Sequence, residues 1–115
     1  MEYENVLLET KGRIATITLN RPEKLNAIND AMFRDFEAAL DEVRRDPESL
    51  VLIIKAAGRA FSVGQDLSGV GTDEVMPPHP RRKAYLSDMF VNSMQSNVRW
   101  QSIFEFHKWT IAQVH

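Results

Sequence analysis

The sequence predicts a layered α/β fold. Three observations predict it: short apolar runs typical of strands, longer stretches with helical apolar spacing, and the order in which the two alternate. That order is β-β-α-β-α-β, and strands that alternate with helices are typical of α/β layers. At 115 residues, the chain has the size of one domain.

The first two predicted strands are residues 6–9 and 13–20, which are separated by a glycine-containing turn at residues 11–12. Two β-rich runs across such a turn predict a β-hairpin. The apolar positions on one face of the second strand are Ala15, Ile17 and Leu19. Pro22 ends this strand, because proline has no N–H to donate to a sheet.

A helix is predicted next, with Asn29 or Asp30 as its N-cap. Its apolar stripe, at helical spacing, consists of Phe33, Phe36, Leu40 and Val43. The helix should end near Asp46, because the residue before a proline avoids the helical region and Pro47 follows.

The second half of the chain begins with a continuous apolar run at residues 51–54, which predicts a strand that is covered on both faces. We expect a loop at 57–67, a mobile surface loop at about 68–80, and a helix from about 81 to 106. Residues 110–114 are predicted to form another buried strand. A chain that stops on such a strand leaves an unpaired sheet edge, which indicates an incomplete domain.

Composition excludes several classes of function. The net charge of −2 argues against a nucleic-acid partner, and the absence of cysteine excludes disulfides, thiolate metal sites and a cysteine nucleophile. The three histidines share no metal-ligand spacing, so we expect no metal site and no cofactor. No apolar run is long enough to span a membrane and no signal peptide is apparent, which predicts a soluble cytoplasmic protein.

The loop at 57–67 is the strongest candidate for a site, because ligands of α/β sheets bind beyond the carboxyl ends of strands. Gly58 and Gly64 permit close approach of the backbone to a ligand. The N–H of Gln65 could donate to a carbonyl oxygen as half of an oxyanion hole, and Asp66 could cap a following helix. The alternative is a strand-to-helix connection that needs glycines only for its bends.

Three segments resemble those of one family. Residues 20–27, Asn-Arg-Pro-Glu-Lys-Leu-Asn-Ala, resemble the Asn-Arg-Pro-x-x-x-Asn-Ala segment of crotonases. Residues 57–67 resemble their Gly-x-x-Phe-(Ser/Cys/Ala)-x-Gly-x-Asp-(Leu/Ile) segment, and residues 108–115 resemble their Lys-Pro-x-Ile-Ala-x-Val strand. The segments follow in family order, so residues 1–115 are expected to be the N-terminal half of a single crotonase-like domain.

The resemblance implies a spiral of ββα units that binds a coenzyme A thioester as substrate, and an enzyme of the enoyl-CoA hydratase/isomerase type that adds water to a 2-enoyl-CoA. It assigns the backbone N–H of Gln65 to the oxyanion hole. The residues that it places at the acyl-CoA site are Lys24, Leu25, Ala27, Ala60, Ser62, Gly64, Gln65, Asp66 and Leu67. Lys24, Arg21 or Arg59 could reach a phosphate of coenzyme A, and the alternative for each is a solvated surface cation.

The same resemblance places the second oxyanion N–H and the two acid–base glutamates beyond the position of His115. The alternative function is therefore a truncated, non-catalytic crotonase-like chain that binds acyl-CoA or a partner subunit. At full length, the family implies a homotrimer or a hexamer.

Overall fold

The computed structural model describes residues 2–66 and 100–115. The chain divides into two compact units, Met1–Asp66 with Phe106–His115 and, separately, Leu67–Glu105. In the second unit, the described residues 100–104 are helical, as predicted for this stretch. The expected mobile loop at 68–80, most of the predicted helix and the candidate residue Leu67 lie outside the described residues.

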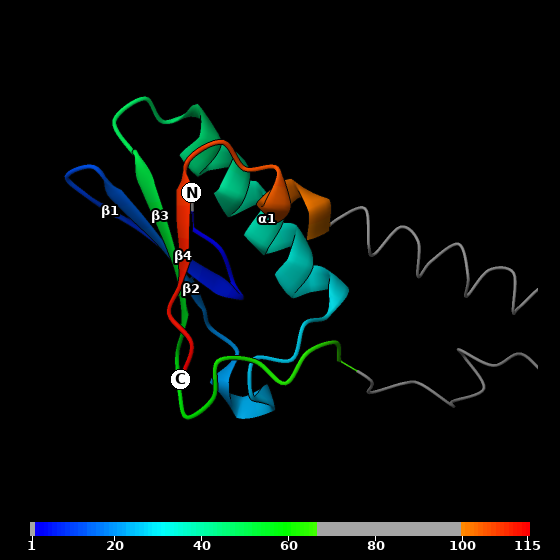
Figure 1. The fold of residues 1–115 in the computed structure, drawn as a ribbon. Coiled ribbons are helices and arrows are strands. Elements are labelled where there is room, and N and C mark those ends of the chain that lie inside the picture. The colour runs from blue at the N-terminus through cyan, green and yellow to red at the C-terminus, as the bar shows by residue number, and fades with distance from the viewer. Residues whose placement is uncertain (1, 67–99) are drawn as a thin grey trace, which may run out of the picture. The chain divides into compact units, whose positions relative to one another are not determined.

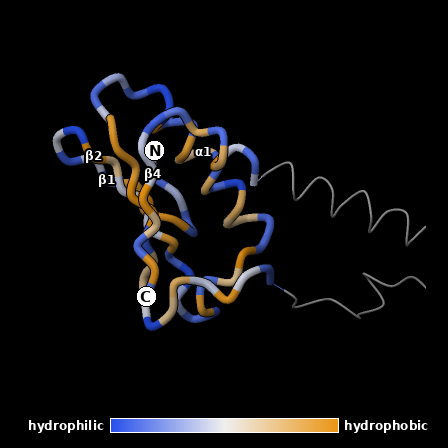
Figure 2. The backbone as a smooth tube through the Cα atoms, viewed as in Figure 1, coloured by the Kyte–Doolittle hydropathy of each residue, from blue (hydrophilic) through white to orange (hydrophobic). Residues whose placement is uncertain are grey.

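The first unit contains a four-stranded sheet in the order β1-β2-β3-β4 (Figure 1). Its strands are β1 (Val6–Lys11), β2 (Ile14–Leu19), β3 (Val51–Ala56) and β4 (Trp109–Ala112). β1 and β2 form the predicted antiparallel hairpin. β2, β3 and β4 run parallel, so their carboxyl ends meet at one edge of the sheet. Figure 2 shows mainly hydrophilic residues at the turn between β1 and β2, and alternating hydrophobic and hydrophilic residues along the helix α1 (Asp30–Arg45).

Helix α1 (Asp30–Arg45) packs across one face of the sheet (Figure 1). Of the two predicted N-caps, Asn29 and Asp30, the structure has Asn29, whose side chain accepts a hydrogen bond of 2.8 Å from the backbone N–H of Met32. The predicted apolar stripe is confirmed, because all four of its side chains are buried. They pack with a sheet face whose buried residues include Ala15, Ile17 and Leu52.

The opposite face of the sheet corrects two predictions. In β3, Leu52 and Ile54 are buried but Val51 and Ile53 are only half-buried, so this strand is covered on one face and not on both. β4 is exposed throughout, with Trp109 81% exposed, whereas a buried strand was predicted. The physical reason is that an apolar run shows what a strand can bury, whereas burial itself requires a covering layer. No helix within residues 2–66 and 100–115 combines the length and apolar character needed to cross a membrane.

Lys108 joins the end of α1 to the start of β4. Its ammonium donates hydrogen bonds of 2.6 Å to the carbonyl oxygens of both Val43 and Asp46. Val43 lies in the last turn of α1 and Asp46 is its C-cap, at the end of the helix where carbonyls lack helical partners and the helix dipole favours a cation. Lys108 therefore supplies a C-terminal cap from a residue far away in the sequence.

Substituting Lys108 with methionine keeps the length of the side chain but removes this cap. We expect a loss of about 1–3 kcal/mol in the free energy of unfolding, since hydrogen bonds from charged groups are among the stronger ones. Urea unfolding followed by circular dichroism measures it. Lys11→Met, at an exposed position of β1, is the matched control. Equal unfolding midpoints for the two variants would contradict the capping role.

The segment before β1 is attached to α1. The Tyr3 hydroxyl donates a hydrogen bond of 2.6 Å to Glu42, and Asn5 donates from its backbone and its side chain to Asp35. Partial burial, with the hydrogen bond to Glu42 and the charges of Glu42 and Asp35, raises the pKa of Tyr3 to about 12.

This shift predicts a pH dependence of stability. The neutral phenol is favoured in the folded chain, so its contribution is complete below the unfolded pKa of about 10 and is lost as the pH rises toward about 12. We expect the free energy of unfolding to fall between these values, and to fall less in Tyr3→Phe. Urea titrations at pH 9 and pH 11 measure both, and parallel losses in the two proteins would contradict it.

Candidate functional site

Two loops meet at the carboxyl ends of the parallel strands. Residues 20–29 follow β2 and include the short 3₁₀ helix η1 (Pro22–Lys24), whereas residues 57–66 follow β3. The loops pair at a parallel bridge between Ile28 and Gln65. Ile28 donates to the carbonyl of Gly64 at 2.8 Å, and its own carbonyl accepts from Asp66 at 2.9 Å. The structure therefore brings the two crotonase-like segments together at the edge where ligands of α/β sheets bind.

Asn26 is the buried centre of this loop pair, with no exposed surface. Its side-chain amide donates hydrogen bonds to the carbonyls of Ala57, at 2.7 Å, and Ala60, at 2.9 Å. Its side-chain oxygen accepts from the backbone N–H of Arg21 at 2.8 Å. The Asn26 side chain thus makes one hydrogen bond within the first loop and two hydrogen bonds to the second loop.

The backbone at Asn26 has a positive φ of 54°, directly after Leu25 at 53°. Asparagine tolerates this left-handed region better than other residues with a side chain. Sequence reasoning included Asn26 in a motif without giving it a role. The sequence feature that could have indicated its role is an asparagine, which tolerates the left-handed conformation, between the apolar residues Leu25 and Ala27 in a loop.

Ser62 also fastens the loops together. Its hydroxyl donates to the carbonyl of Asn26 at 2.8 Å and accepts from the N–H of Gly64 at 3.1 Å. Val63 donates to the carbonyl of Leu25 at 3.2 Å. These bonds fix the course of the chain just before Gln65.

Arg21 and Asp66 form an ion pair that is largely shielded from solvent. The Arg21 Nη1 lies 2.7 Å from the Asp66 carboxylate, and the two side chains are 15% and 12% exposed. The same nitrogen donates to the carbonyl of Ala27 at 2.9 Å. The Arg21 guanidinium makes these bonds inside the loop pair, and its contact with a coenzyme A phosphate stays a prediction. Asp66 pairs with an arginine distant in sequence, and the helix that it was predicted to cap lies outside the described residues.

The remaining candidate residues line this region to different depths. Lys24, Gly64 and Gln65 are exposed, and Ala27 is buried. The half-buried candidates are Leu25, Ala60, Ser62 and Asp66. The Gln65 N–H has no hydrogen-bond partner among residues 2–66 and 100–115, because the bridge to Ile28 uses the groups on either side of it. The predicted oxyanion position thus lies on an exposed residue whose N–H has no partner in the described part of the chain.

The end of the chain lies beside the second loop (Figure 1). The His115 ring Nε2 lies 2.8 Å from the carbonyl of Gly58, and the His115 carbonyl accepts from the N–H of Phe61 at 3.3 Å. The segment that continues β4 thus reaches the same edge of the sheet as the loop pair.

The sequence profile of the enoyl-CoA hydratase/isomerase family matches residues 9–115. The chain belongs to this family. Membership confirms the resemblance to crotonases, and similarity to solved structures of the family confirms the crotonase-like fold.

Individual members of the enoyl-CoA hydratase/isomerase family resemble the chain over different lengths. A short-chain-enoyl-CoA hydratase of Clostridium acetobutylicum is 39% identical over 69 residues, which are 59% of this chain and 26% of that protein. A 1,2-epoxyphenylacetyl-CoA isomerase of Escherichia coli is 39% identical over 74 residues, 64% of this chain and 28% of that protein.

Among solved structures, an enoyl-CoA hydratase/isomerase from Xanthobacter autotrophicus Py2 superposes with a TM-score of 0.75 at 32% identity. The superposition covers 99% of this chain and 39% of that one. The chain therefore matches between about a quarter and two-fifths of the length of these relatives.

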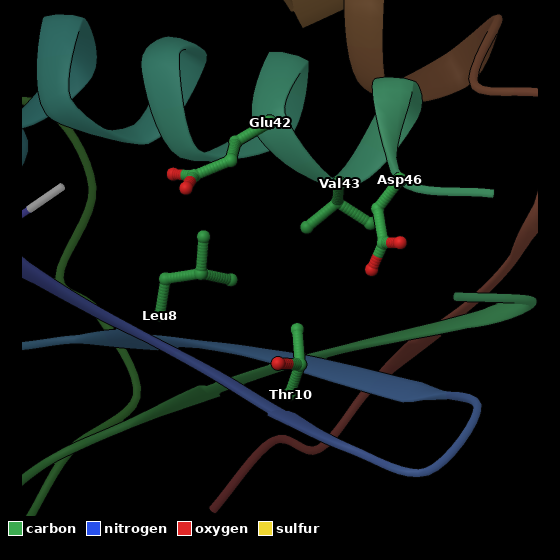
Figure 3. Close-up of a pocket in the computed structure, with 5 residues that line it drawn as sticks. All are labelled: Leu8, Thr10, Glu42, Val43 and Asp46. Carbon is green, nitrogen blue, oxygen red and sulfur yellow. The ribbon is translucent and has the colours of Figure 1, made fainter. Parts of the chain in front are cut away.

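A hollow of about 270 Å³ lies between β1 and the last turns of α1, lined by Leu8, Thr10, Glu42, Val43 and Asp46 (Figure 3). It contains none of the residues that the family resemblance places at the acyl-CoA site. A hydrogen bond from Ser49, with one from the backbone of Glu48 and the charge of Lys108, lowers the pKa of Asp46. The carboxylates of Glu42 and Asp46 would repel the phosphates of coenzyme A, which makes the hollow unsuitable for that ligand. The loop pair therefore remains the candidate site.

Proposed function

We propose that the loop pair binds the thioester end of an acyl-CoA, and that Gln65 donates its backbone N–H to the thioester carbonyl. The observation that carries the proposal is that the N–H of Gln65, an exposed residue, has no hydrogen-bond partner within residues 2–66 and 100–115. Gln65 follows β3 at the carboxyl edge of three parallel strands. The chain's family supports the substrate class, since named relatives act on CoA thioesters. The function in its full form is the addition of water to a 2-enoyl-CoA.

The chemical role of Gln65 follows from where charge develops. When a nucleophile adds to the β-carbon of an enoyl thioester, negative charge moves onto the carbonyl oxygen and an enolate forms. A donor fixed in advance at that oxygen stabilises the enolate more than the neutral substrate. The bridge to Ile28 and the bonds of Ser62 hold this donor in place before substrate arrives.

The cations available for the phosphates of coenzyme A are Lys24 and Arg59. Both are exposed. Lys24 lies two residues after Pro22 and Arg59 lies one residue after Gly58, and Pro22 and Gly58 are where the two loops meet. Lysine acts on phosphate as a point charge, so neither needs the geometry of a paired guanidinium. Arg21 is left out of this role because of its bonds to Asp66 and Ala27.

Hydration also requires a general acid and a general base. Under the proposal, these groups and the second oxyanion donor come from the part of the family domain that follows the position of His115, which lies beside the second loop. The residues described here then supply binding and one donor. A protein with the whole domain would hydrate a 2-enoyl-CoA, in the trimer or hexamer that the family implies.

Gln65→Pro tests the proposal, because proline removes the N–H and the bridge to Ile28 does not use it. Gln65→Ala is the matched control, since it removes the side chain and keeps the donor. We expect crotonyl-CoA bound to the unsubstituted chain or to Gln65→Ala to show a lowered infrared frequency of its thioester carbonyl. The shift should disappear in Gln65→Pro while the affinity for free coenzyme A is kept.

In a protein that contains the whole domain, Gln65→Pro should lower kcat by a factor of about 100 to 1000, as expected for one lost oxyanion donor. Amide spectra of each variant check that the fold is kept. A carbonyl shift that persists in Gln65→Pro, or an unsubstituted chain that binds no crotonyl-CoA, would overturn the proposal.

A further inference from the structure

Arg21 touches both sides of the bridge that presents Gln65. Its Nη1 donates to the carbonyl of Ala27, the residue just before Ile28, and to the carboxylate of Asp66, the residue just after Gln65. One nitrogen therefore links the strand-like segment of the first loop to that of the second. It does so one residue away from the bridge on each side.

We propose that Arg21 is a positioning residue that fixes the direction of the Gln65 N–H through Ala27 and Asp66. The inference rests on the proposed function for the meaning of that direction. It goes further in assigning to a cation of the site a role other than binding phosphate.

The backbone of Arg21 is itself held in place. Its N–H donates to the side chain of Asn26 at 2.8 Å, and its carbonyl accepts from Lys24 at 3.1 Å and from Asn26 at 2.9 Å. The guanidinium is thus anchored at its base before it reaches across to Asp66. Because its backbone is fixed, Arg21 loses little conformational entropy when its guanidinium bonds to Ala27 and Asp66. It can therefore restrict the position of the second loop.

The shielding of the pair decides how much Arg21 matters. With the side chains only 15% and 12% exposed, water replaces a lost partner poorly. Removal of Arg21 takes a close positive charge away from Asp66, which costs more in a shielded pair than in a surface ion pair. Asp66 would then shift, and with it the peptide that joins it to Gln65.

A shift of this kind acts on the orientation of the donor and not on phosphate binding. Small misplacements of a catalytic group can cost on the order of a hundredfold in rate. We therefore expect Arg21→Met to reduce the polarisation of a bound thioester carbonyl while the affinity for free coenzyme A changes less than about twofold. If Arg21 instead bound a phosphate of coenzyme A, Arg21→Met would lower the affinity for free coenzyme A and leave the carbonyl polarisation unchanged.

The experiment compares Arg21→Met with Arg21→Lys, which restores a cation, and with Arg45→Met, at an exposed arginine of α1. Amide hydrogen exchange is read at Ile28 and Asp66, whose N–H groups make the bridge bonds, and at Ala57, whose N–H bonds to the carbonyl of Leu19. We expect protection at Ile28 and Asp66 to fall about tenfold in Arg21→Met, with Ala57 unchanged and partial recovery in Arg21→Lys.

Asp66→Asn, which keeps the size of the side chain, provides the same readout should Arg21→Met not fold. Unchanged protection at Ile28 and Asp66 in either variant would overturn the inference, as would an equal loss in Arg45→Met. Failure of the proposed function looks different. In that case crotonyl-CoA shows no carbonyl shift with the unsubstituted chain, whereas the amide exchange still decides whether Arg21 holds the bridge.

Discussion

Replacing Asn26 with alanine is expected to lower the free energy of unfolding by about 4 kcal/mol. The substitution leaves the carbonyls of Ala57 and Ala60 and the N–H of Arg21 without their partner, at a residue with no exposed surface. Unpaired buried polar groups each cost about 1–3 kcal/mol. Alanine also carries a penalty of about 1–2 kcal/mol in the left-handed region that Asn26 occupies, at a φ of 54°.

The loss is a large share of the stability of a small domain, which is typically about 5–15 kcal/mol. Thermal and urea unfolding followed by circular dichroism measure it. Asn20→Ala, at a half-buried position whose backbone pairs with Asn5, is the matched control and should cost under about 1 kcal/mol. Similar losses for the two variants would show that Asn26 does not hold the loops together.

Asn26→Asp separates the hydrogen bonds from the volume of the side chain. The carboxylate keeps an acceptor for the N–H of Arg21, but its second oxygen faces the carbonyls of Ala57 and Ala60. Lone pairs then oppose lone pairs unless the group is protonated. We therefore expect this variant to be destabilised at neutral pH and to recover in part as the pH is lowered.

What could be predicted from the sequence was local. The apolar stripe of α1, its N-cap at Asn29 and the hairpin of β1 and β2 all depend on residues within a few positions of one another. The order of strands and helices then fixed the edge at which the loops meet. The resemblance to crotonases added the prediction for Gln65, whose N–H has no partner among the described residues.

What could not be predicted depends on contacts between distant segments. Asn26 binds carbonyls 31 and 34 residues away, and Lys108 caps a helix more than 60 residues before it. No period or motif encodes such pairs. The ion pair of Asp66 shows the same limit, because its partner Arg21 lies 45 residues earlier. The exposure of β4 differs in kind, since it depends on a covering layer that no pattern within the strand reports.

Gly58→Ala is expected to cost about 3–4 kcal/mol, for two separable reasons. The residue has a φ of 85°, where a side chain carries strain of about 1–2 kcal/mol. A Cβ at this position would also lie 2.8 Å from the Cβ of Pro22, which is too close for any two carbon atoms that are not bonded. Relief requires the two loops to move apart, because Pro22 is a rigid ring.

Gly64→Ala isolates the first reason, the backbone strain. Its φ of 93° carries similar strain, but an added Cβ would meet nothing within 4 Å among the described residues. We expect it to cost about 1–2 kcal/mol, as measured by urea unfolding. The further loss of stability in Gly58→Ala, beyond that in Gly64→Ala, is then the energy needed to separate the two loops. Equal losses in the free energy of unfolding would mean that the loops separate at little energetic cost where Gly58 and Pro22 meet.

The clash can be assigned to Pro22 by a double-mutant cycle. Pro22→Gly removes the opposing Cβ and leaves the Cα of residue 22 at an ordinary contact distance of 3.5 Å from the added group. In that background, Gly58→Ala should cost only about what Gly64→Ala costs, because strain remains and the clash does not. A cost that stays at its full value would place the collision elsewhere in the loop pair. Recovery would establish that contact between the loops depends on a proline and a glycine that face each other, which explains why a bulkier residue at position 58 would disturb the presentation of Gln65.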